Sequence, residues 1–438
     1  MIKKLVLVFV VLLGLQSYAQ EGTASPYSYY GIGSLKFKGT VENRSMGGLS
    51  IYNDSIHINL RNPASYGGNN LLSYNNEARP VKFAVGGGHS AINLKSDSEE
   101  AKTSTTTFDY IALEIPVGKL GFGLGLMPYT SVGYKLENHN GNGDITNRFR
   151  GEGGLNKVYF AAGYQLTKGL SIGVDANYNF GNIQNSTIEF QYNSDGELVQ
   201  YQTREDNRSD LSGLNMNFGL SYKTMLNSKL EFMSGLTYSP QSNITSQNEQ
   251  ALSTITISAT TGQEFIINTI QSDLDANGLR ETDLTLPSKF SIGAGIGEPR
   301  KWFAGIEYGS IKTSNLNNEL YSSVNTTFND GSTFSVGGFY IPQYNSFTSY
   351  WKRTVYRAGL RFENTGLEVN NEAIKEFGIS FGLGLQVGGI YSPFSNANIG
   401  FELGKRGTTS NNLIQENFFN VNISLSLSDR WFQKQKYN

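Results

Sequence analysis

The 438-residue sequence contains no cysteine. This excludes disulfides, thiolate metal sites and a lipid-anchored N-terminal cysteine. Charged residues make up 16% of the chain, against about 25% in an average soluble protein. The formal net charge of −2 gives no indication of nucleic-acid binding. Proline occurs only 10 times, and blocks of helix-forming Ala, Glu, Lys and Leu are scarce.

The abundant residues favour strands and turns. The chain has 50 glycines, 25 tyrosines and 26 phenylalanines, together with many Ser, Asn and Thr residues. Aromatic and β-branched side chains suit strands, and Gly, Asn and Ser suit turns. The composition therefore predicts an all-β protein.

The first nineteen residues predict a secretory signal peptide. Lys3 and Lys4 precede an apolar run over residues 5–15, and Ser17 and Ala19 then fit the small-x-small cleavage pattern. A transmembrane anchor is the alternative, but the run is shorter than the roughly 20 residues that span a bilayer. No later segment approaches a spanning helix, so we expect an exported protein cleaved after Ala19.

After residue 78, runs of apolar and polar residues alternate with a period of two, which is the signal for strands. Most runs exceed the usual five or six residues and suit strands that cross a membrane at a tilt. We count about fourteen, an even number as in single-chain outer-membrane barrels. A soluble sandwich or propeller is the alternative, but no blade-length repeat is visible. The predicted strands are 79–95, 103–116, 119–134, 154–166, 170–192, 208–225, 229–250, 281–297, 301–314, 331–343, 352–364, 374–388, 396–406 and 416–429.

The connections between these strands predict an orientation. The second, fourth, sixth and eighth gaps are tight, whereas the odd gaps are mostly longer and polar, as at 135–153, 193–207, 251–280 and 315–330. Long loops of outer-membrane barrels face outward, which places both termini in the periplasm of a Gram-negative bacterium. Trp431 and Phe432 fall where an interfacial aromatic girdle belongs.

Three segments resemble the FadL family of outer-membrane transporters for long-chain fatty acids and hydrocarbons. The first contains Met46–Gly47–Gly48, then Asn53–Asp54, then Asn62–Pro63–Ala64, similar to the family's "MGGA" and "NPA" runs. The second is "DLTLPSKFSIGAGIG" at 283–297, and the third is "FGLGLMPYTSVGY" at 122–134. The resemblance implies that residues 20–78 form an N-terminal hatch, containing Asn62, Pro63 and Ala64, which plugs the lumen of a barrel formed by 79–438.

Pro128 lies inside the predicted third strand. Proline cannot donate to a β-ladder, so it marks an edge, a bulge or a break. In the family that the chain resembles, a kink in this strand opens the wall sideways, which would let an apolar ligand leave into the membrane. The alternative is that Pro128 marks a strand end before the loop at 135–153.

Other patterns suggest chemistry only weakly. "GISFG" at 378–382 matches a nucleophile motif that requires a strand–turn–helix context, but it lies amid alternating strand residues. The three histidines are isolated in sequence, with no zinc spacing. Asp273, Asp275 and Asn277 begin a segment like a calcium loop, but Leu284 stands where a bidentate Glu belongs, so a polar turn is the alternative. We expect neither a cofactor nor a catalytic site.

Three functions remain open. The first is passive uptake of hydrophobic molecules such as fatty acids or hydrocarbons, which would bind loops 193–207 and 251–280, pass to a pocket near the hatch and leave beside Pro128. The second is a structural or accessory barrel in a multiprotein outer-membrane assembly for secretion or barrel insertion, with outer-membrane proteins or lipoproteins as partners. The Asn, Ser and Thr content of 240–250 favours this second reading, because these residues do not suit an apolar groove. The third, an outer-membrane enzyme, lacks an acid, base and nucleophile set.

Overall fold

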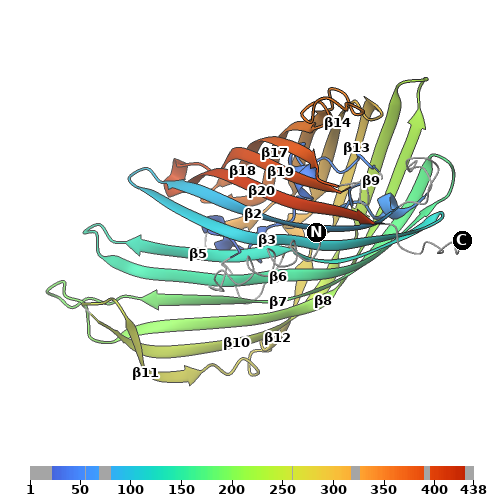
Figure 1. Cartoon of the computed structure of the whole chain (residues 1–438). Coiled ribbons are helices and arrows are strands. Elements are labelled where there is room, and N and C mark those ends of the chain that lie inside the picture. The colour runs from blue at the N-terminus through green and yellow to red at the C-terminus, as the bar shows by residue number, and fades with distance from the viewer. Residues whose placement is uncertain are drawn as a thin grey trace, which may run out of the picture.

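The chain folds into a closed antiparallel β-barrel (Figure 1). The computed structural model describes residues 22–54, 56–68, 80–258, 260–316, 326–388 and 395–429. In this part of the chain the wall has fourteen strands, some of them interrupted, and β20 pairs with β2 to close it. They are β2 (Val81–Lys95), β3 (Glu100–Val117), β4 (Leu120–Pro128) continued by β5 (Thr130–His139), β6 (Ile145–Gln165), β7 (Leu170–Glu189), β8 (Gln202–Met225), β9 (Glu231–Ser239) continued by β10 (Ser242–Ile257), β12 (Glu281–Leu286) with β13 (Lys289–Glu298), β14 (Trp302–Ile311), β15 (Thr326–Phe328) with β16 (Gly331–Tyr340), β17 (Val355–Val369), β18 (Glu372–Gln386), β19 (Asn396–Arg406) and β20 (Gln415–Asp429).

The predicted fold class is confirmed, whereas several predicted loops are wrong in part. β5 runs to His139, β6 begins at Ile145 and β8 at Gln202, so most of 135–153 and the last part of 193–207 are strand. These polar extensions pair with one another, as between residues 182–189 of β7 and 203–210 of β8. Apolar alternation marks only the part of a strand that meets lipid, so strands that continue into water escape the pattern.

The two ends of the barrel differ. Tight turns join β3 to β4, β6 to β7, β8 to β9 and β13 to β14, and we call this the short-turn end. The opposite, long-loop end carries the segments 190–201 and 258–280. The predicted alternation of loop lengths is not uniform: Asn370 and Asn371, both with positive φ, form a tight turn at the long-loop end, whereas 341–354 is a longer connection at the short-turn end. The predicted signal peptide and Trp431 and Phe432 lie outside the described residues.

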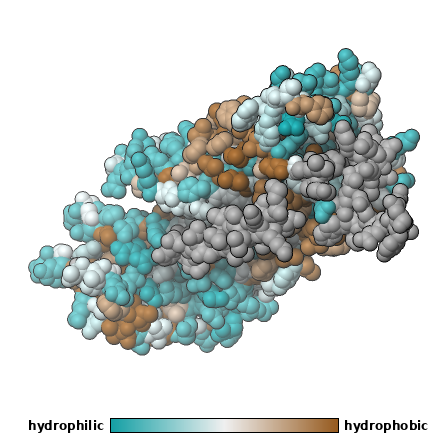
Figure 2. Space-filling model, viewed as in Figure 1, coloured by the Kyte–Doolittle hydropathy of each residue, from teal (hydrophilic) through white to brown (hydrophobic). Residues whose placement is uncertain are grey.

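The wall strands are apolar outside and polar inside. In β14, Ile306 and Tyr308 are 53% and 47% exposed, whereas Glu307 between them is buried. In β18, Phe381 is exposed and Glu376 and Ser380 are buried. Figure 2 shows apolar residues gathered over the wall region labelled β17–β20 in Figure 1. A closed barrel with an apolar outer belt is the architecture of Gram-negative outer-membrane proteins.

Among the described residues, no helix has both the length and the apolar character needed to cross a membrane, a finding that does not bear on β-barrels.

Residues 22–68, here called the inner segment, lie within the barrel. Its elements are η1 (Pro26–Tyr29), β1 (Ser34–Leu35), α2 (Val41–Arg44) and η2 (Pro63–Tyr66). η1 packs on β5, α2 on β18–β20 and η2 on β6–β8, so the segment touches opposite sides of the wall. Its apolar side chains form mixed clusters with wall residues; one joins Leu49 and Ile51 to Phe303 and Phe339. The buried core therefore lies between the inner segment and the wall.

Candidate functional site

The Asn62–Pro63–Ala64 turn sits directly on the wall. Asn62 precedes η2, and its Oδ1 accepts a hydrogen bond from the Ala64 N–H at 3.0 Å, while its Nδ2 donates to the Leu220 carbonyl of β8 at 3.1 Å. Pro63 occupies the first helical position, where its missing N–H costs nothing. The amide of Asn62 thus ties the turn both to itself and to the barrel.

Wall glycines make room for this turn. A Cβ on Gly219 of β8 would lie 2.2 Å from Asn62 Oδ1, and one on Gly173 of β7 would lie 2.3 Å from the Pro63 backbone. Any side chain at either position would displace the turn. Part of the barrel's high glycine content therefore reflects backbone of the inner segment lying against the wall.

The Met46–Gly47–Gly48 run is seated in the same way on the other side of the barrel. It follows α2, whose start is capped by Thr40, and Gly47 and Gly48 have φ of 71° and 91°, which favour glycine. The Gly47 N–H donates to Ser380 Oγ of β18 at 3.0 Å. Ser380, at the centre of "GISFG", thus lies mid-strand and holds the inner segment.

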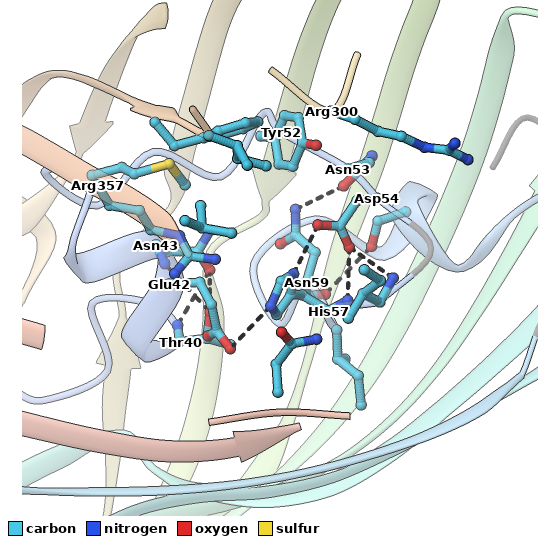
Figure 3. A pocket seen from close by; sticks show the side chains of 18 of the residues that line it. Thr40, Glu42, Asn43, Tyr52, Asn53, Asp54, His57, Asn59, Arg300 and Arg357 are labelled. Atoms are coloured by element: carbon cyan, nitrogen blue, oxygen red, sulfur yellow. Dashed lines mark hydrogen bonds and ion pairs between the residues drawn. The ribbon is translucent and has the colours of Figure 1, made fainter. Parts of the chain in front are cut away.

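His57 lies between two carboxylates (Figure 3). Its Nδ1 is 2.7 Å from Asp54 Oδ2, and its Nε2 is 3.9 Å from Glu42 Oε1. Asp54 Oδ1 also accepts the backbone N–H groups of Ile56 and His57. Burial opposes ionisation of Asp54, but the charge and hydrogen bonds of His57 outweigh it and hold the Asp54 pKa well below its usual range. The Asn53–Asp54 turn is therefore fixed by an ionised carboxylate.

A cavity adjoins this cluster (Figure 3), and the lining residues Arg300, Ile341 and Tyr344 place it toward the short-turn end. Apolar side chains such as Tyr52 and Phe339 line part of it, and the rest carries Glu42, Arg300 and Arg357. A second cavity lies on another side of the inner segment, and its lining combines apolar side chains such as Phe37 and Leu60 with charged groups that include Lys38, Arg61, Lys157, Asp175, Glu307 and Arg361. The space around the inner segment is thus bounded by a mixture of apolar and charged side chains.

Ion pairs join the inner segment to several strands of the wall. Arg44 Nη1 is 3.0 Å from Asp109 Oδ2 of β3, and Arg61 Nη2 is 2.8 Å from Glu307 Oε1 of β14. Glu307 also accepts the backbone N–H of Ser50 at 2.7 Å. These contacts clamp the segment from two directions.

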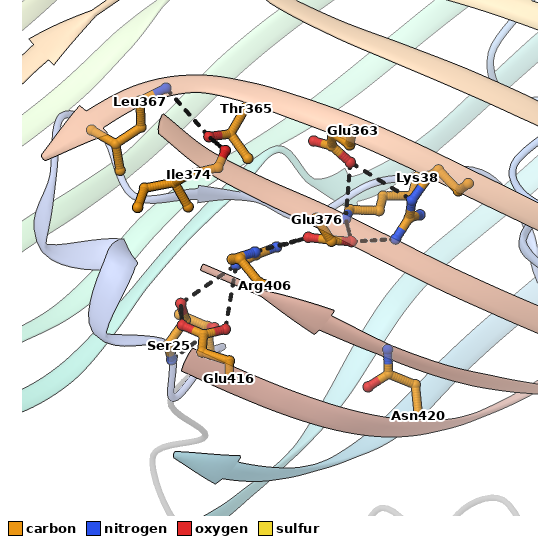
Figure 4. A network of polar contacts seen from close by, with 12 residues as sticks. Ser25, Lys38, Glu363, Thr365, Leu367, Ile374, Glu376, Arg406, Glu416 and Asn420 are labelled. Carbon is orange, nitrogen blue, oxygen red and sulfur yellow. Dashed lines mark hydrogen bonds and ion pairs between the residues drawn. The ribbon is translucent and has the colours of Figure 1, made fainter. Parts of the chain in front are cut away.

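The largest network centres on Glu376 of β18 (Figure 4). Its carboxylate binds Lys38 Nζ of the inner segment at 2.5 Å, Arg406 Nη2 of β19 at 2.5 Å, and Arg361 of β17. Arg361 also lies 2.7 Å from Glu402 Oε1. Buried charges destabilise a fold unless they are paired and hydrogen-bonded. This network is paired throughout, so it holds Lys38 firmly.

The alternation of residues along the strands does not by itself identify this network. The signal was present, because Glu307, Glu376 and Glu402 each interrupt a membrane-crossing run of apolar and small residues. An ionisable residue inside such a run is costly in lipid and points to an inward-facing position. The closure of the barrel determines which charged residues meet across the lumen. The sequence pattern alone does not show how the barrel closes.

Pro128 ends β4, and the chain resumes as β5 at Thr130. β3 pairs with β4 only over Ile111–Val117, and no ladder joins β3 to β5 in the part of the chain that the structure describes. β5 instead pairs at its base with β1 of the inner segment. The two strands separate on the long-loop side of Pro128 (Figure 1). The use of this break as an exit stays a prediction.

The calcium-loop residues lie in the 272–280 connection. Asp275 binds Arg280 through both carboxylate oxygens, at 2.7 and 2.8 Å from Nε, and Asp273 Oδ1 accepts the Ala276 N–H. Gly278 takes a positive φ of 67°, as a turn requires. Calcium binding by Asp273, Asp275 and Asn277 stays a prediction, although the carboxylate of Asp275 already has a partner.

The remaining histidines lie apart from His57. His89 Nδ1 is 2.9 Å from Thr106 Oγ1 on the neighbouring strand β3, and His139 ends β5. Within the described residues, no group of three or more His, Asp or Glu side chains is arranged to hold a metal ion.

Several solved structures with the same fold match this chain at low sequence identity, and they include toluene transporters and a FadL homologue. The toluene transporter TbuX of Ralstonia pickettii has a TM-score of 0.57 and 14% identity, covering 90% of this chain and 99% of that chain. The toluene transporter TodX of Pseudomonas putida has a TM-score of 0.56, 14% identity and the same coverage. A FadL homologue of Pseudomonas aeruginosa has a TM-score of 0.55, 11% identity and again the same coverage.

These likenesses establish the FadL-like fold that the sequence segments suggested, but not membership of the FadL family. A comparison with curated protein sequences found no match. The model of a different family, BamG, matches residues 1–438. The chain therefore belongs to the BamG family.

Proposed function

We propose that the protein is a non-catalytic barrel subunit of a multiprotein outer-membrane assembly for barrel insertion or secretion. One observation carries the proposal: buried ion pairs hold the inner segment to β3, β14 and β18. A conduit for apolar molecules would need this segment to move, and each of these pairs would then leave a buried charge without its partner. The family shown for this chain, BamG, differs from the FadL family of transporters, which is in keeping with this role.

In this proposal the inner segment is the predicted hatch, and it acts as a fixed plug. A fourteen-strand lumen is too wide for wall side chains alone to fill, so an open barrel would leak. The long-loop end faces outward and both termini lie in the periplasm, as in other barrels with long loops at one end. Partners are other outer-membrane proteins or lipoproteins.

Uptake of hydrophobic molecules is the second candidate. The separation of β3 from β5 beside Pro128 supports it, as does a mainly apolar cavity at the long-loop end. Side chains that line this cavity include Tyr27, Tyr30, Ile32, Leu35, Phe328 and Leu367. For this role the inner segment would have to move to connect that cavity with the periplasm.

A reversible disulfide between the inner segment and the wall can distinguish the two proposed functions. A Cβ on Gly400 of β19 would lie 3.2 Å from Val41 Cγ1 of α2, about the distance between Cβ of one cysteine and Sγ of the other across a disulfide. It would also lie 2.7 Å from Ser45 Oγ, a hydroxyl that must rotate to make room. The chain has no other cysteine. Cells carrying Val41→Cys/Gly400→Cys are compared with wild type and with the single variant Val41→Cys for uptake of labelled oleate or toluene. Our proposal predicts equal uptake in all three, oxidised or reduced. Uptake that falls on oxidation and returns on reduction would instead support the channel.

A further inference from the structure

The strand β11 (Glu264–Gln271) extends the barrel wall at the long-loop end. β10 pairs with β8 along one edge; along its other edge it pairs first with β12 and then, farther out, with β11. Figure 1 shows β11 as the outermost strand of this region. In the described part of the chain, no ladder lies on the second edge of β11.

β11 exposes large apolar side chains on both of its faces. Phe265, Ile266, Ile267 and Ile270 are 48–65% exposed, and Leu252 of β10 beside them is 43% exposed. An apolar patch appears in Figure 2 where Figure 1 draws β11. The part of β10 that pairs with β11 also pairs with the polar residues 202–206 of β8, whereas the exposed apolar residues of β8 begin at Leu214. The patch therefore lies beyond the apolar belt, and lipid does not account for it. β11 has one bulge, at Ile267, where its register with β10 shifts. An apolar edge strand without a partner nevertheless attracts other strands unless something covers it.

β11 also carries no charged residue that lacks an ion-pair partner. Its one charged residue, Glu264, lies 2.9 Å from Arg150 Nη2 and within 3.6 Å of Arg148 and Arg204. A charged residue in a strand laid against residues 265–270 would be buried without a counter-ion. The chemistry of β11 therefore selects an uncharged, apolar segment.

The ladder with β10 shows which main-chain groups face the open edge. The Ser272 N–H donates to the Gln250 carbonyl and the Ser258 N–H to the Gln263 carbonyl, both at 2.9 Å. Because bonded and non-bonded pairs alternate in antiparallel ladders, the N–H groups of Ile266 and Thr269 point away from β10. They are available to a strand added at the second edge.

We propose that β11 is a docking edge that pairs with an extended, uncharged, apolar strand of another protein in the assembly. This inference rests on the proposed function and specifies where one partner binds. An added strand would use both the open edge of β11 and its exposed apolar side chains. Main-chain hydrogen bonds along the edge would supply affinity, and alternate apolar side chains would pack on each face. β11 has eight residues, whereas a stable interface needs about 20–30 a side. An interface between two copies made by β11 alone would therefore have too few residues to be stable. The strand is one contact of a larger interface.

The matched variants are Thr269→Pro and Thr269→Val. Both lose the hydroxyl contact with Ser253, but only proline removes the N–H at the open edge. The tagged full-length protein is purified from outer membranes in mild detergent, and native mass spectrometry gives its subunits. Hydrogen exchange is then compared between the assembly and the barrel stripped of its partners.

We expect the amides of Ile266 and Thr269 to exchange at least 10-fold slower in the assembly than in the stripped barrel. We also expect Thr269→Pro to lose one stoichiometric subunit that Thr269→Val retains. Suppose both variants keep every subunit, and the two amides exchange equally fast in the assembly and in the stripped barrel. The proposal that β11 is a docking edge is then wrong, while the proposed role in an assembly stands. A wild-type barrel that purifies alone, or only as a dimer of itself, overturns both proposals.

Discussion

At the scale of single residues, glycine determines how closely the inner segment approaches the wall. Gly173 and Gly219 contact the Asn62–Pro63 turn, and Gly337 and Gly359 contact the backbone of Met46, all at distances that exclude a Cβ. These glycines lie at inward positions of strands, where glycine is otherwise unfavourable. In the sequence, the spacing of these glycines looks like ordinary strand alternation. Only the folded structure shows that the inner segment packs against them.

Substitution of Gly219 tests this close packing. Gly219→Val should displace the Asn62 turn and lower the free energy of unfolding by about 1–3 kcal/mol, because the new side chain overpacks the contact. The matched control is Gly141→Val, at a position where a Cβ meets nothing within 4 Å. Urea unfolding in detergent, followed by tyrosine and tryptophan fluorescence, measures both. Equal midpoints for the two variants would show that the turn does not rest on Gly219.

Removal of Glu376 tests the buried charge network. Glu376→Ala leaves Lys38, Arg361 and Arg406 without their shared carboxylate, which should cost about 3–5 kcal/mol. The control is Lys301→Ala, which removes the exposed pair with Glu298 and should change stability by less than about 0.5 kcal/mol. The same urea titration reports both changes. A Glu376→Ala barrel as stable as wild type would mean that the network does not hold the inner segment.

At the scale of elements, strands were predictable and their extensions were not. The runs at 79–95 and 396–406 match β2 and β19 to within two residues, because lipid on one side and a polar lumen on the other impose a strict alternation. β6 begins nine residues earlier than predicted, because residues 145–153 pair in water, where no alternation is needed. The break at Pro128 was visible in sequence, but the separation of β3 from β5 required the ladder registers.

The contacts of the inner segment, too, could be predicted from the sequence only in part. The MGG and NPA runs indicated turns in sequence, but nothing local connects Lys38 with Glu376, which lies 338 positions away. Such pairs depend on strand register, and a shift of one residue would turn Glu376 toward lipid. The candidate site therefore became clear only with the closed barrel.

At the scale of the whole molecule, the proposed orientation can be tested by labelling. The chain has no cysteine, so single substitutions report position cleanly. Thr261→Cys lies at the long-loop end beside β11, and Ser228→Cys lies in the β8–β9 turn at the short-turn end. A membrane-impermeant maleimide added to intact cells should label position 261 at least 10-fold more than position 228. Both should react equally after the membrane is opened; the reverse pattern in intact cells would place the long loops in the periplasm.

The central claim is that this FadL-like barrel serves as a scaffold in an assembly, with a lumen closed by a fixed, ion-paired segment. The most direct test is the native mass of the C-terminally tagged protein purified from outer membranes in mild detergent. Our account predicts a complex with a fixed stoichiometric set of partner proteins. A lone barrel that carries bound fatty acid or hydrocarbon would contradict it and establish the channel instead.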